Sequence, residues 1–186
     1  MATTETSHTD LVNALARAGF GMPVEAARHL VSVALAPGDL RRVASACAES
    51  PDPDLAIGQL CRWIAMTGAV PGAGMLSRLA MVLGVSTSLG AFLARRPDAA
   101  EILREARSIE GPKSESTLRT SALRTIGRAE DPTAAIRVWK RREFLRIACR
   151  DLAGQASVEE VGRELAHLAE AALHAALASL EEEHPA

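Results

Sequence analysis

Apolar residues along this chain recur at helical spacing, in short segments that begin at proline or a small polar residue and end at glycine. Proline suits the first turn of a helix, where its missing N–H leaves no bond unmade, and glycine is favoured just after the last turn. The first predicted helix begins at Thr9 or Asp10 and ends at Gly19, and the second covers 23–35. A third follows Asp39. Further helices cover 53–68, 73–83 and 87–95, and another begins at Pro97. The first hundred residues are therefore predicted as a series of short helices.

The helices lengthen after the polar segment 108–116, which is broken by Gly111-Pro112 and is typical of a linker. Long helices are predicted over about 116–128, 132–153 and 158–183. Ser157 and Glu160 have the spacing of a capping box, so the last helix should begin there. We therefore divide the chain into a short-helix region at 1–107, a linker at 108–116 and a long-helix region at 117–186.

Charge divides the long-helix region into two blocks of opposite sign. Residues 119–150 contain nine Lys or Arg against three acids, whereas residues 151–186 contain eight acids against Arg163 alone. Consecutive helices of opposite charge, joined by a few residues around Gly154, favour an antiparallel hairpin. The basic helix is thus expected to have its acidic counterpart beside it.

Basic residues are densest in WKRREFLRIACRDLAG, residues 139–154. On a helical wheel Arg142, Arg146 and Arg150 run down one side. The opposite side is apolar and consists of Phe144, Leu145, Ile147, Ala148 and Leu152. The pattern predicts a solvated or hairpin-paired face for the three arginines. Arg141 falls in the apolar arc, where it needs a carboxylate partner or must extend its side chain to water.

Composition favours the all-α class and argues against a nucleic-acid surface. Of the 186 residues 48% are hydrophobic but only 3% are aromatic, and tyrosine is absent. The core must therefore be formed by small and aliphatic side chains on helices rather than by aromatic or β-branched strands. A net charge of -2 and the few aromatic residues available for stacking make nucleic-acid binding the weaker interpretation of the basic helix.

The three cysteines and the amino-terminal segment indicate the cellular compartment of the protein. Cys47, Cys61 and Cys149 are odd in number and have no C-x-x-C spacing, which predicts buried reduced thiols rather than disulfides or a zinc site. The opening MATTETSHTD has neither a basic start nor an apolar run, so no signal peptide is expected. We therefore expect a cytoplasmic protein without a membrane partner.

His167, Glu170 and His174 fall on one face of the last predicted helix, in an arrangement that resembles a set of metal ligands. The other charged residues of that face are Glu160, Arg163, Glu164 and Glu181. Because so many charges share the face, we interpret it as a solvated surface and not as a metal site.

Two further patterns have structural interpretations that we prefer. Asp52-Pro53-Asp54 spells the D-x-D of two-metal nucleotidyl transfer, but it straddles a helix-initiating proline, which indicates helix capping. Gly72-Ala73-Gly74 lacks the third glycine and the preceding strand of a dinucleotide loop. We therefore predict no catalytic, cofactor-binding or metal-ligating residue in this chain.

The segment LAMVLGVSTSLGAFLARRPD, residues 79–98, is similar to a helix-turn-helix of a DNA-binding protein. Gly84 would lie at the turn and Ser86 would cap the second helix. That helix, however, presents small residues where a recognition helix carries Arg, Lys, Gln or Asn, and Gly90 lies where the motif has a packed aliphatic side chain. A helix-turn-helix DNA-binding regulator is our alternative function, and a helical interaction protein without a ligand is a third.

Four segments together carry a family resemblance: DPDLAIGQL at 52–60, VLGVSTSLGAFLARRPD at 82–98, VWKRREFLRIACRDLAG at 138–154 and SVEEVGRELAHLAEAALHAAL at 157–177. The most specific pattern is R-R-E-x-L-R-I-A-x-R-D-L, from Arg141 to Leu152. In order and spacing these segments resemble the N-terminal helical region of the bifunctional glutamine synthetase adenylyltransferase/adenylyl-removing enzyme. The resemblance covers about residues 52–183, and the first fifty residues carry no diagnostic motif. It also offers another explanation for 82–98, since the family carries a similar L-G-x-S segment without binding DNA.

The resemblance implies an enzyme that transfers AMP from ATP, with Mg²⁺, to a tyrosine of glutamine synthetase. A related domain of such enzymes removes the AMP by phosphorolysis, under the control of a PII-type signal protein. The expected partners are therefore glutamine synthetase, a PII-type protein and an adjoining nucleotidyltransferase domain. Arg141, Arg142, Arg146 and Arg150 would lie near that domain, as candidates for interdomain or phosphate contacts.

The chain departs from the family pattern in one respect. The glycine-rich strand-loop and the paired aspartates of the nucleotidyltransferase domain are missing. Without carboxylates to hold Mg²⁺, nothing would neutralise the charge that develops on phosphate. We therefore expect a helical scaffold, a fragment or a truncated relative of the enzyme, which by itself is inactive and has no cofactor of its own.

Overall fold

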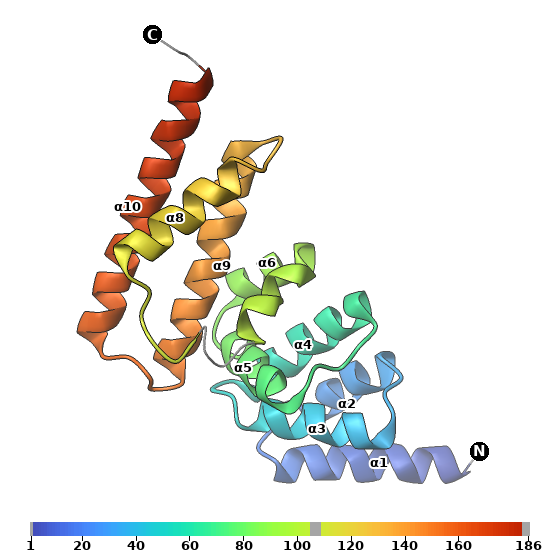
Figure 1. Ribbon diagram of the computed structural model, residues 1–186. Coiled ribbons are helices and arrows are strands. Elements are labelled where there is room, and N and C mark those ends of the chain that lie inside the picture. Colours follow the sequence, from blue (N-terminus) through green and yellow to red (C-terminus); the bar gives the residue numbers. More distant parts are fainter. Residues whose placement is uncertain (1, 105–108, 184–186) are drawn as a thin grey trace. The chain divides into compact units, whose positions relative to one another are not determined.

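The computed structural model describes residues 2–104 and 109–183 (Figure 1). Every regular element in these ranges is a helix, which confirms the predicted all-α class. The chain forms two compact units, residues 1–104 and 105–186. Across the described ranges, no helix combines the length and the apolar character that crossing a membrane requires.

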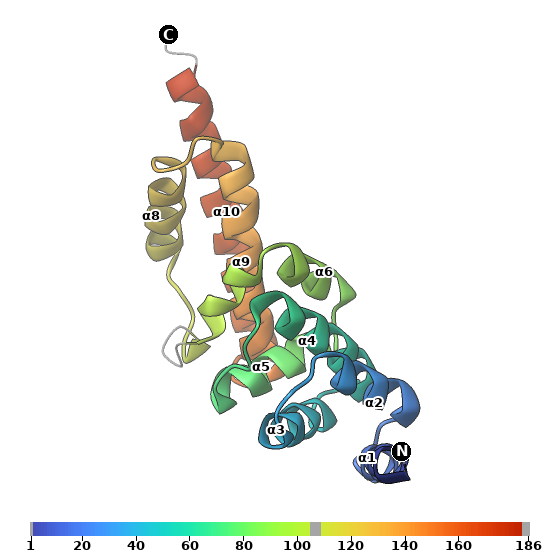
Figure 2. The same ribbon diagram turned by 90° about the vertical axis from the view of Figure 1, so that its right-hand side faces the viewer.

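The first unit is a succession of short helices, which Figure 2 shows from a second direction. They are α1 (Ala2–Arg17), α2 (Pro23–Ser32), α3 (Pro37–Ala48), α4 (Pro53–Thr67), α5 (Ala73–Leu83), α6 (Thr87–Arg95) and the 3-10 helix η1 (Pro97–Leu103). Three predicted boundaries are wrong. α1 begins well before the predicted Thr9, because the residues of its first turns are polar and show no apolar repeat. α3 begins at Pro37 and not after Asp39. α2 ends before Leu35, since Ala34 has a φ of 47°.

Most helix starts of the first unit follow the predicted punctuation. Pro23, Pro53 and Pro97 each occupy a first turn. The Asp52 carboxylate accepts a hydrogen bond from the Leu55 N–H at 2.9 Å, which confirms the predicted helix cap. Gly68 ends α4 with a φ of 69°, a conformation that glycine adopts without steric cost.

α4 is the central helix of the first unit and contacts α2, α3, α5, α6 and η1. Its buried residues are Ala56, Ile57, Gln59, Leu60, Cys61, Trp63 and Ile64. They point to more than one side of the helix, because a helix surrounded by neighbours must be apolar over most of its circumference. Removal of this apolar surface from water, at about 25 cal/mol per Å², holds the other helices around α4.

The second unit contains α8 (Glu115–Ile126), α9 (Pro132–Leu152) and α10 (Val158–Glu183), and each of these helices packs against the other two. Their shared core consists of Leu118, Ala122, Ile126, Trp139, Ile147, Leu168, Ala171 and Ala175. The indole N–H of Trp139 donates to Ser121 Oγ at 3.1 Å. The unit is therefore a three-helix assembly, in which α8 packs against both helices of the predicted hairpin, and the antiparallel hairpin itself stays a prediction.

α10 begins at the predicted capping box. The Ser157 N–H donates to a Glu160 carboxylate oxygen at 3.0 Å, and the Glu160 N–H donates to Ser157 Oγ at 3.2 Å. Each side chain thus satisfies a backbone donor that the first turn of a helix leaves unpaired. This confirms the predicted start of the last helix.

All three cysteines are buried and free, as predicted. Cys47 lies on α3 and Cys61 on α4, two helices that pack together. Burial raises the pKa of Cys61 from 9.0 to about 12. Burial, with a smaller contribution from the neighbouring Cys61, also raises the pKa of Cys47. Both thiols therefore remain protonated at neutral pH.

Candidate functional site

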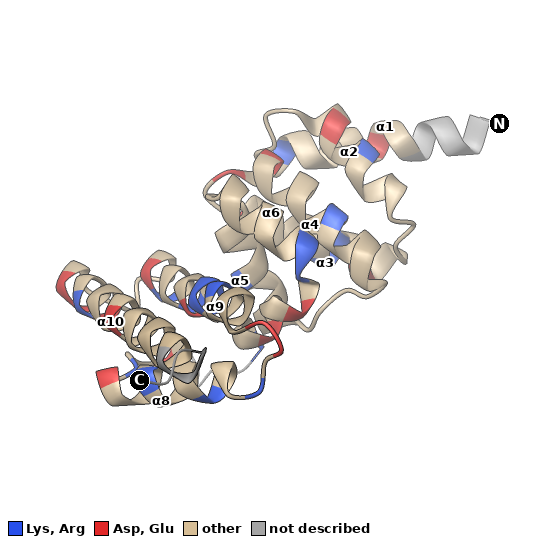
Figure 3. Cartoon of the chain, turned by 90° about the horizontal axis from the view of Figure 1, so that it is seen from above, with Lys and Arg blue, Asp and Glu red and all other residues tan. Residues whose placement is uncertain are grey.

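The candidate site is a group of buried ion pairs in the second unit, which we call the buried charge cluster. Its members are Lys113, Glu143, Arg146, Arg150 and Glu164. Arg146 is 0% exposed, Arg150 and Glu164 are 1% exposed, and Glu143 is 4% exposed. Three members come from α9 and one from α10, and Figure 3 shows the basic residues of α9 next to α10. Lys113 comes from the segment before α8.

Glu164 joins three segments of the second unit. One carboxylate oxygen accepts from Arg146 Nη2 and from the backbone N–H of Lys113, the latter at 2.7 Å. The other oxygen accepts from Arg150 Nη1 at 2.6 Å. A single carboxylate on the second turn of α10 therefore fixes both α9 and the segment that leads into α8.

Glu143 closes the cluster from α9 itself. One of its carboxylate oxygens accepts from Arg146 Nε at 2.9 Å and the other from Lys113 Nζ at 2.6 Å. All four carboxylate oxygens of the cluster thus accept hydrogen bonds from its basic side chains or backbone. Because these oxygens are engaged, the cluster is suited to holding helices together and not to binding a metal ion.

The spacing along α9 explains why the charged residues converge. Glu143, Arg146 and Arg150 are three and four positions apart, so one face of the helix carries all three. Burying charges is costly unless each is paired and hydrogen-bonded. The cluster pairs its charges across three segments and leaves Arg150 Nε without a hydrogen-bond partner, so its stability depends on α9, α10 and the segment before α8 coming together.

The structure corrects the predicted environment of the basic helix. A solvated face is wrong for Arg146 and Arg150, which are buried. Their ion pairs with Glu164 confirm the other expectation, that an acidic counterpart lies beside the basic helix. Phe144, placed on the apolar side by the wheel, is 44% exposed. A wheel built on one helix treats every arginine as a surface residue, and it has no means of including a partner on another helix.

Arg141 and Arg142 have a different environment. Arg141 is exposed, which agrees with a side chain that extends to water from the apolar arc, and Arg142 is partly exposed. Of the four arginines predicted as interdomain or phosphate contacts, these two remain at the surface. That role stays a prediction for both.

Sequence reasoning missed Lys113 and Glu164. Lys113 was assigned to the predicted linker at 108–116. Residue 108 of that linker lies outside the described residues. Glu164 was assigned to the solvated face of the last helix, which is wrong, since it is buried. The excess of acids after residue 150 was the one signal for a partner, but it did not distinguish Glu164 from the exposed Glu159 or Glu170.

The other candidate residues do not form a metal centre. Glu170 and His174 are exposed and His167 is partly exposed, in keeping with a solvated face, whereas the Glu181 side chain lies outside the described residues. In the described part of the chain, no group of three or more His, Cys, Asp or Glu could hold a metal ion. Asp54 accepts from the backbone N–H groups of Gly21 at 2.8 Å and Met22 at 3.1 Å. Within the D-x-D motif, Asp52 therefore caps α4, and Asp54 binds the loop between α1 and α2.

The helix-turn-helix-like segment corresponds to α5 and α6. A Cβ atom added to Gly90 would lie 1.3 Å from Gln59 Oε1, so the glycine makes room for that side chain. The Gln59 amide in turn donates to the Leu83 carbonyl at 2.6 Å. Thr87 and Ser88 are the exposed residues at the start of α6. Gly90 is thus required by packing inside the first unit, which explains why the motif's aliphatic residue is missing.

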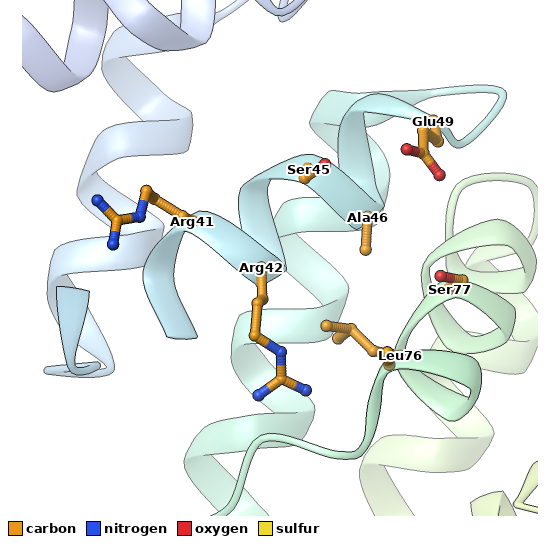
Figure 4. Close-up of a pocket in the computed structure, with 8 residues that line it drawn as sticks. Arg41, Arg42, Ser45, Ala46, Glu49, Leu76 and Ser77 are labelled. Atoms are coloured by element: carbon orange, nitrogen blue, oxygen red, sulfur yellow. The ribbon is translucent and has the colours of Figure 1, made fainter. Parts of the chain in front are cut away.

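A shallow pocket of about 330 Å³ lies between α3 and α5 in the first unit (Figure 4). Arg41 points away from the pocket in Figure 4. Arg42 donates to Asp39 and to the Pro71 carbonyl, both at 2.7 Å. The guanidinium groups of Arg41 and Arg42 therefore do not converge on one point in the pocket, and we assign the pocket no ligand.

Comparison with known proteins identifies the family. Residues 76–185 match the family model for glutamate-ammonia ligase adenylyltransferase. The chain is 34% identical to the bifunctional glutamine synthetase adenylyltransferase/adenylyl-removing enzyme of Streptomyces coelicolor, over 92% of this chain and 18% of that protein. The enzyme of the same name from Mycolicibacterium smegmatis is 32% identical, over 88% of this chain and 18% of its own length. No solved structure matches the chain.

The chain therefore belongs to the glutamate-ammonia ligase adenylyltransferase family, which confirms the resemblance. It spans less than a fifth of the length of these relatives. The matched portion also reaches into the first fifty residues, which carried no diagnostic motif, since 88% or more of the chain is covered.

Proposed function

We propose that this chain is a helical supporting segment of an enzyme that adds AMP to glutamine synthetase and removes it again, and that the reaction centre lies elsewhere in the enzyme. The proposal rests on one observation: most of this chain corresponds to less than a fifth of relatives that carry both activities in their name. The buried charge cluster supports it, because its carboxylates hold helices together and are not directed at a substrate.

The described residues do not fit the ATP and Mg²⁺ that the family resemblance implies. Mg²⁺ requires oxygen ligands in an octahedral arrangement, commonly including carboxylates. Asp52 caps α4, Asp54 binds two backbone N–H groups, and Glu143 and Glu164 are engaged with basic residues. These carboxylates are therefore unsuited to AMP transfer, and the role that we propose for the chain is to position other parts of the enzyme.

The proposed partners are glutamine synthetase, a PII-type signal protein and an adjoining nucleotidyltransferase domain, all in the cytoplasm. Arg141 and Arg142 are the members of the basic helix that can reach a partner, since Arg141 is exposed and Arg142 partly exposed. Arg146 and Arg150 contribute indirectly by holding α9 against α10.

A chimeric enzyme tests the supporting role. The part of the Mycolicibacterium smegmatis enzyme that aligns with this chain is replaced by the 186 residues, and transfer of labelled AMP to glutamine synthetase is measured. We expect the chimera to retain AMP transfer. A version with Glu164→Gln should lose most of this activity, because the ion pairs that hold α9 against α10 are lost. A chimera no more active than the enzyme with the same part deleted would contradict the proposal.

The same chimera tests the surface arginines. Arg141→Ala with Arg142→Ala should reduce AMP transfer, while Arg137→Ala, an exposed arginine of the same helix, should leave it unchanged. Equal activity of both variants would remove Arg141 and Arg142 from the proposed contact. The isolated chain should transfer no AMP at all, and detectable transfer would overturn the assignment of the reaction to other parts of the enzyme.

A further inference from the structure

α10 has a second apolar face, opposite the one that packs in the second unit. The packed face includes Leu168, Ala171 and Ala175. The second face, which we call the outer seam, consists of Gly162, Ala166, Ala169, Leu173, Ala176 and Leu180. Their spacing alternates strictly between four and three residues, the period of helices that pack along each other in a coiled coil.

The outer seam is exposed in the described chain. Leu173 is 66% exposed and Leu180 is 53% exposed, and Leu177, which borders the seam, is 58% exposed. Figures 1 and 2 both show the carboxyl-terminal end of α10 projecting beyond α8 and α9. Three large leucines within eight residues of one helix form an apolar patch of the kind that marks an interaction surface.

The residue sizes along the outer seam are complementary about its midpoint. The first half holds only small residues, the second half holds Leu173 and Leu180 with Ala176 between them, and the midpoint of the seam falls at position 171. When two such helices run antiparallel, Gly162 of one lies opposite Leu180 of the other, and Ala169 lies opposite Leu173. Each leucine of the seam then meets a small residue and Ala166 meets Ala176, so the two helices can approach closely.

A parallel pair would lack this complementarity. It would align Leu180 with Leu180 and Gly162 with Gly162, so the helices would be held apart at one end and leave a gap at the other. A two-fold axis is also the symmetry that lets one patch serve on both partners. The pattern therefore selects a second copy of the same helix in the antiparallel direction.

We propose that the outer seam is a dimer interface at which two copies of this chain pack α10 against α10, antiparallel about position 171. Arg163 then borders Leu177 of the second copy and can cover it with its methylene groups. Glu170 lies beside the axis and comes near its own counterpart, which limits the strength of the dimer.

Sedimentation or light scattering of the purified chain at increasing concentration tests the dimer. We expect a mass that rises toward twice the 19.6 kDa of one chain. Leu173→Glu with Leu177→Glu should give 19.6 kDa at every concentration, whereas Val31→Glu, at an equally exposed position of the first unit, should leave the dimer intact. Glu170→Gln should lower the concentration at which the dimer forms. A wild-type chain that remains at 19.6 kDa at all concentrations would overturn the proposal.

Cysteine cross-linking tests the direction of packing. A Cβ added to Gly162 meets no other atom within 4 Å, and the three native cysteines are buried. In the antiparallel pair Gly162→Cys and Leu180→Cys of opposite copies are neighbours, so the double variant should form a covalent dimer on mild oxidation. Leu180→Cys alone should not, because 18 residues separate the two positions by about 27 Å along the axis. A covalent dimer from Leu180→Cys alone would show parallel packing and contradict the proposal.

Discussion

Glu164 joins α9, α10 and the segment before α8 through a single carboxylate, and this makes it the most informative residue of the second unit. Glu164→Gln keeps the shape of the side chain but removes its charge. Arg146 and Arg150 would then be buried next to a neutral amide, which should lower the free energy of unfolding by about 3–5 kcal/mol. Urea unfolding monitored by helical circular dichroism measures the change.

Glu130→Gln is the matched control for that substitution, because Glu130 is exposed and an exposed charge contributes little to stability. Its effect should remain within about 0.5 kcal/mol. If Glu164→Gln were equally mild, the buried charge cluster could not be what holds the three segments together.

Cys61 gives a second prediction at the residue scale, concerning pH. Burial raises the pKa of Cys61 from 9.0 to about 12, so the unfolded chain loses the thiol proton at lower pH than the folded chain does. Stability should therefore be constant below pH 9 and decrease between pH 9 and 12, by up to about 1.4 kcal/mol per pH unit for this group. A Cys61→Ala variant should lose stability less steeply over that range, and parallel curves for the two proteins would contradict the prediction.

Among the elements, the packing of α4 against α6 depends on a glycine. Gly90→Ala would place a methyl group on Gln59 Oε1, and Gln59 would have to abandon its hydrogen bond to Leu83. We expect a loss of about 1–3 kcal/mol, measured by urea unfolding. Gln59→Ala combined with Gly90→Ala should recover part of it, because the methyl group would then have room.

Gly162→Ala is the control for a glycine within a helix. Position 162 has open space around it, and alanine has the higher helix propensity by about 1 kcal/mol. At low protein concentration this variant should be at least as stable as the natural chain. If Gly90→Ala also stabilised the protein, the close approach of Gln59 would be wrong.

At the scale of the whole molecule, each unit has its own core and its own tryptophan. Trp63 lies in the core of the first unit and Trp139 in that of the second. Since the chain has two tryptophans in total, Trp139→Phe leaves a fluorescent reporter for the first unit and Trp63→Phe leaves one for the second. Glu164→Gln should shift the urea midpoint reported by Trp139 and leave that of Trp63 in place. Equal shifts in both reporters would show that the two units unfold as one.

The sequence predicted helices better than it predicted environments. The caps of α4 and α10 and the end of α4 at Gly68 follow from interactions within a few residues, so local motifs such as Asp52-Pro53 and Ser157-Glu160 were sufficient. α1 extended beyond its predicted start because no apolar repeat marks its first turns. The family was also readable from the sequence, because the Arg141–Leu152 pattern is a local motif that can be recognised without knowing the fold.

The sequence by itself determined the all-α class, most helix starts, the burial of the cysteines and the membership of the family. Only the tertiary structure decided which charges are buried. Arg146 and Glu164 look like surface residues on their own helices and become interior residues when α9 and α10 pack, because a buried charge is stable only beside a partner that is distant in sequence. The same holds for Gly90, whose missing side chain is explained by a glutamine thirty-one positions earlier in the chain.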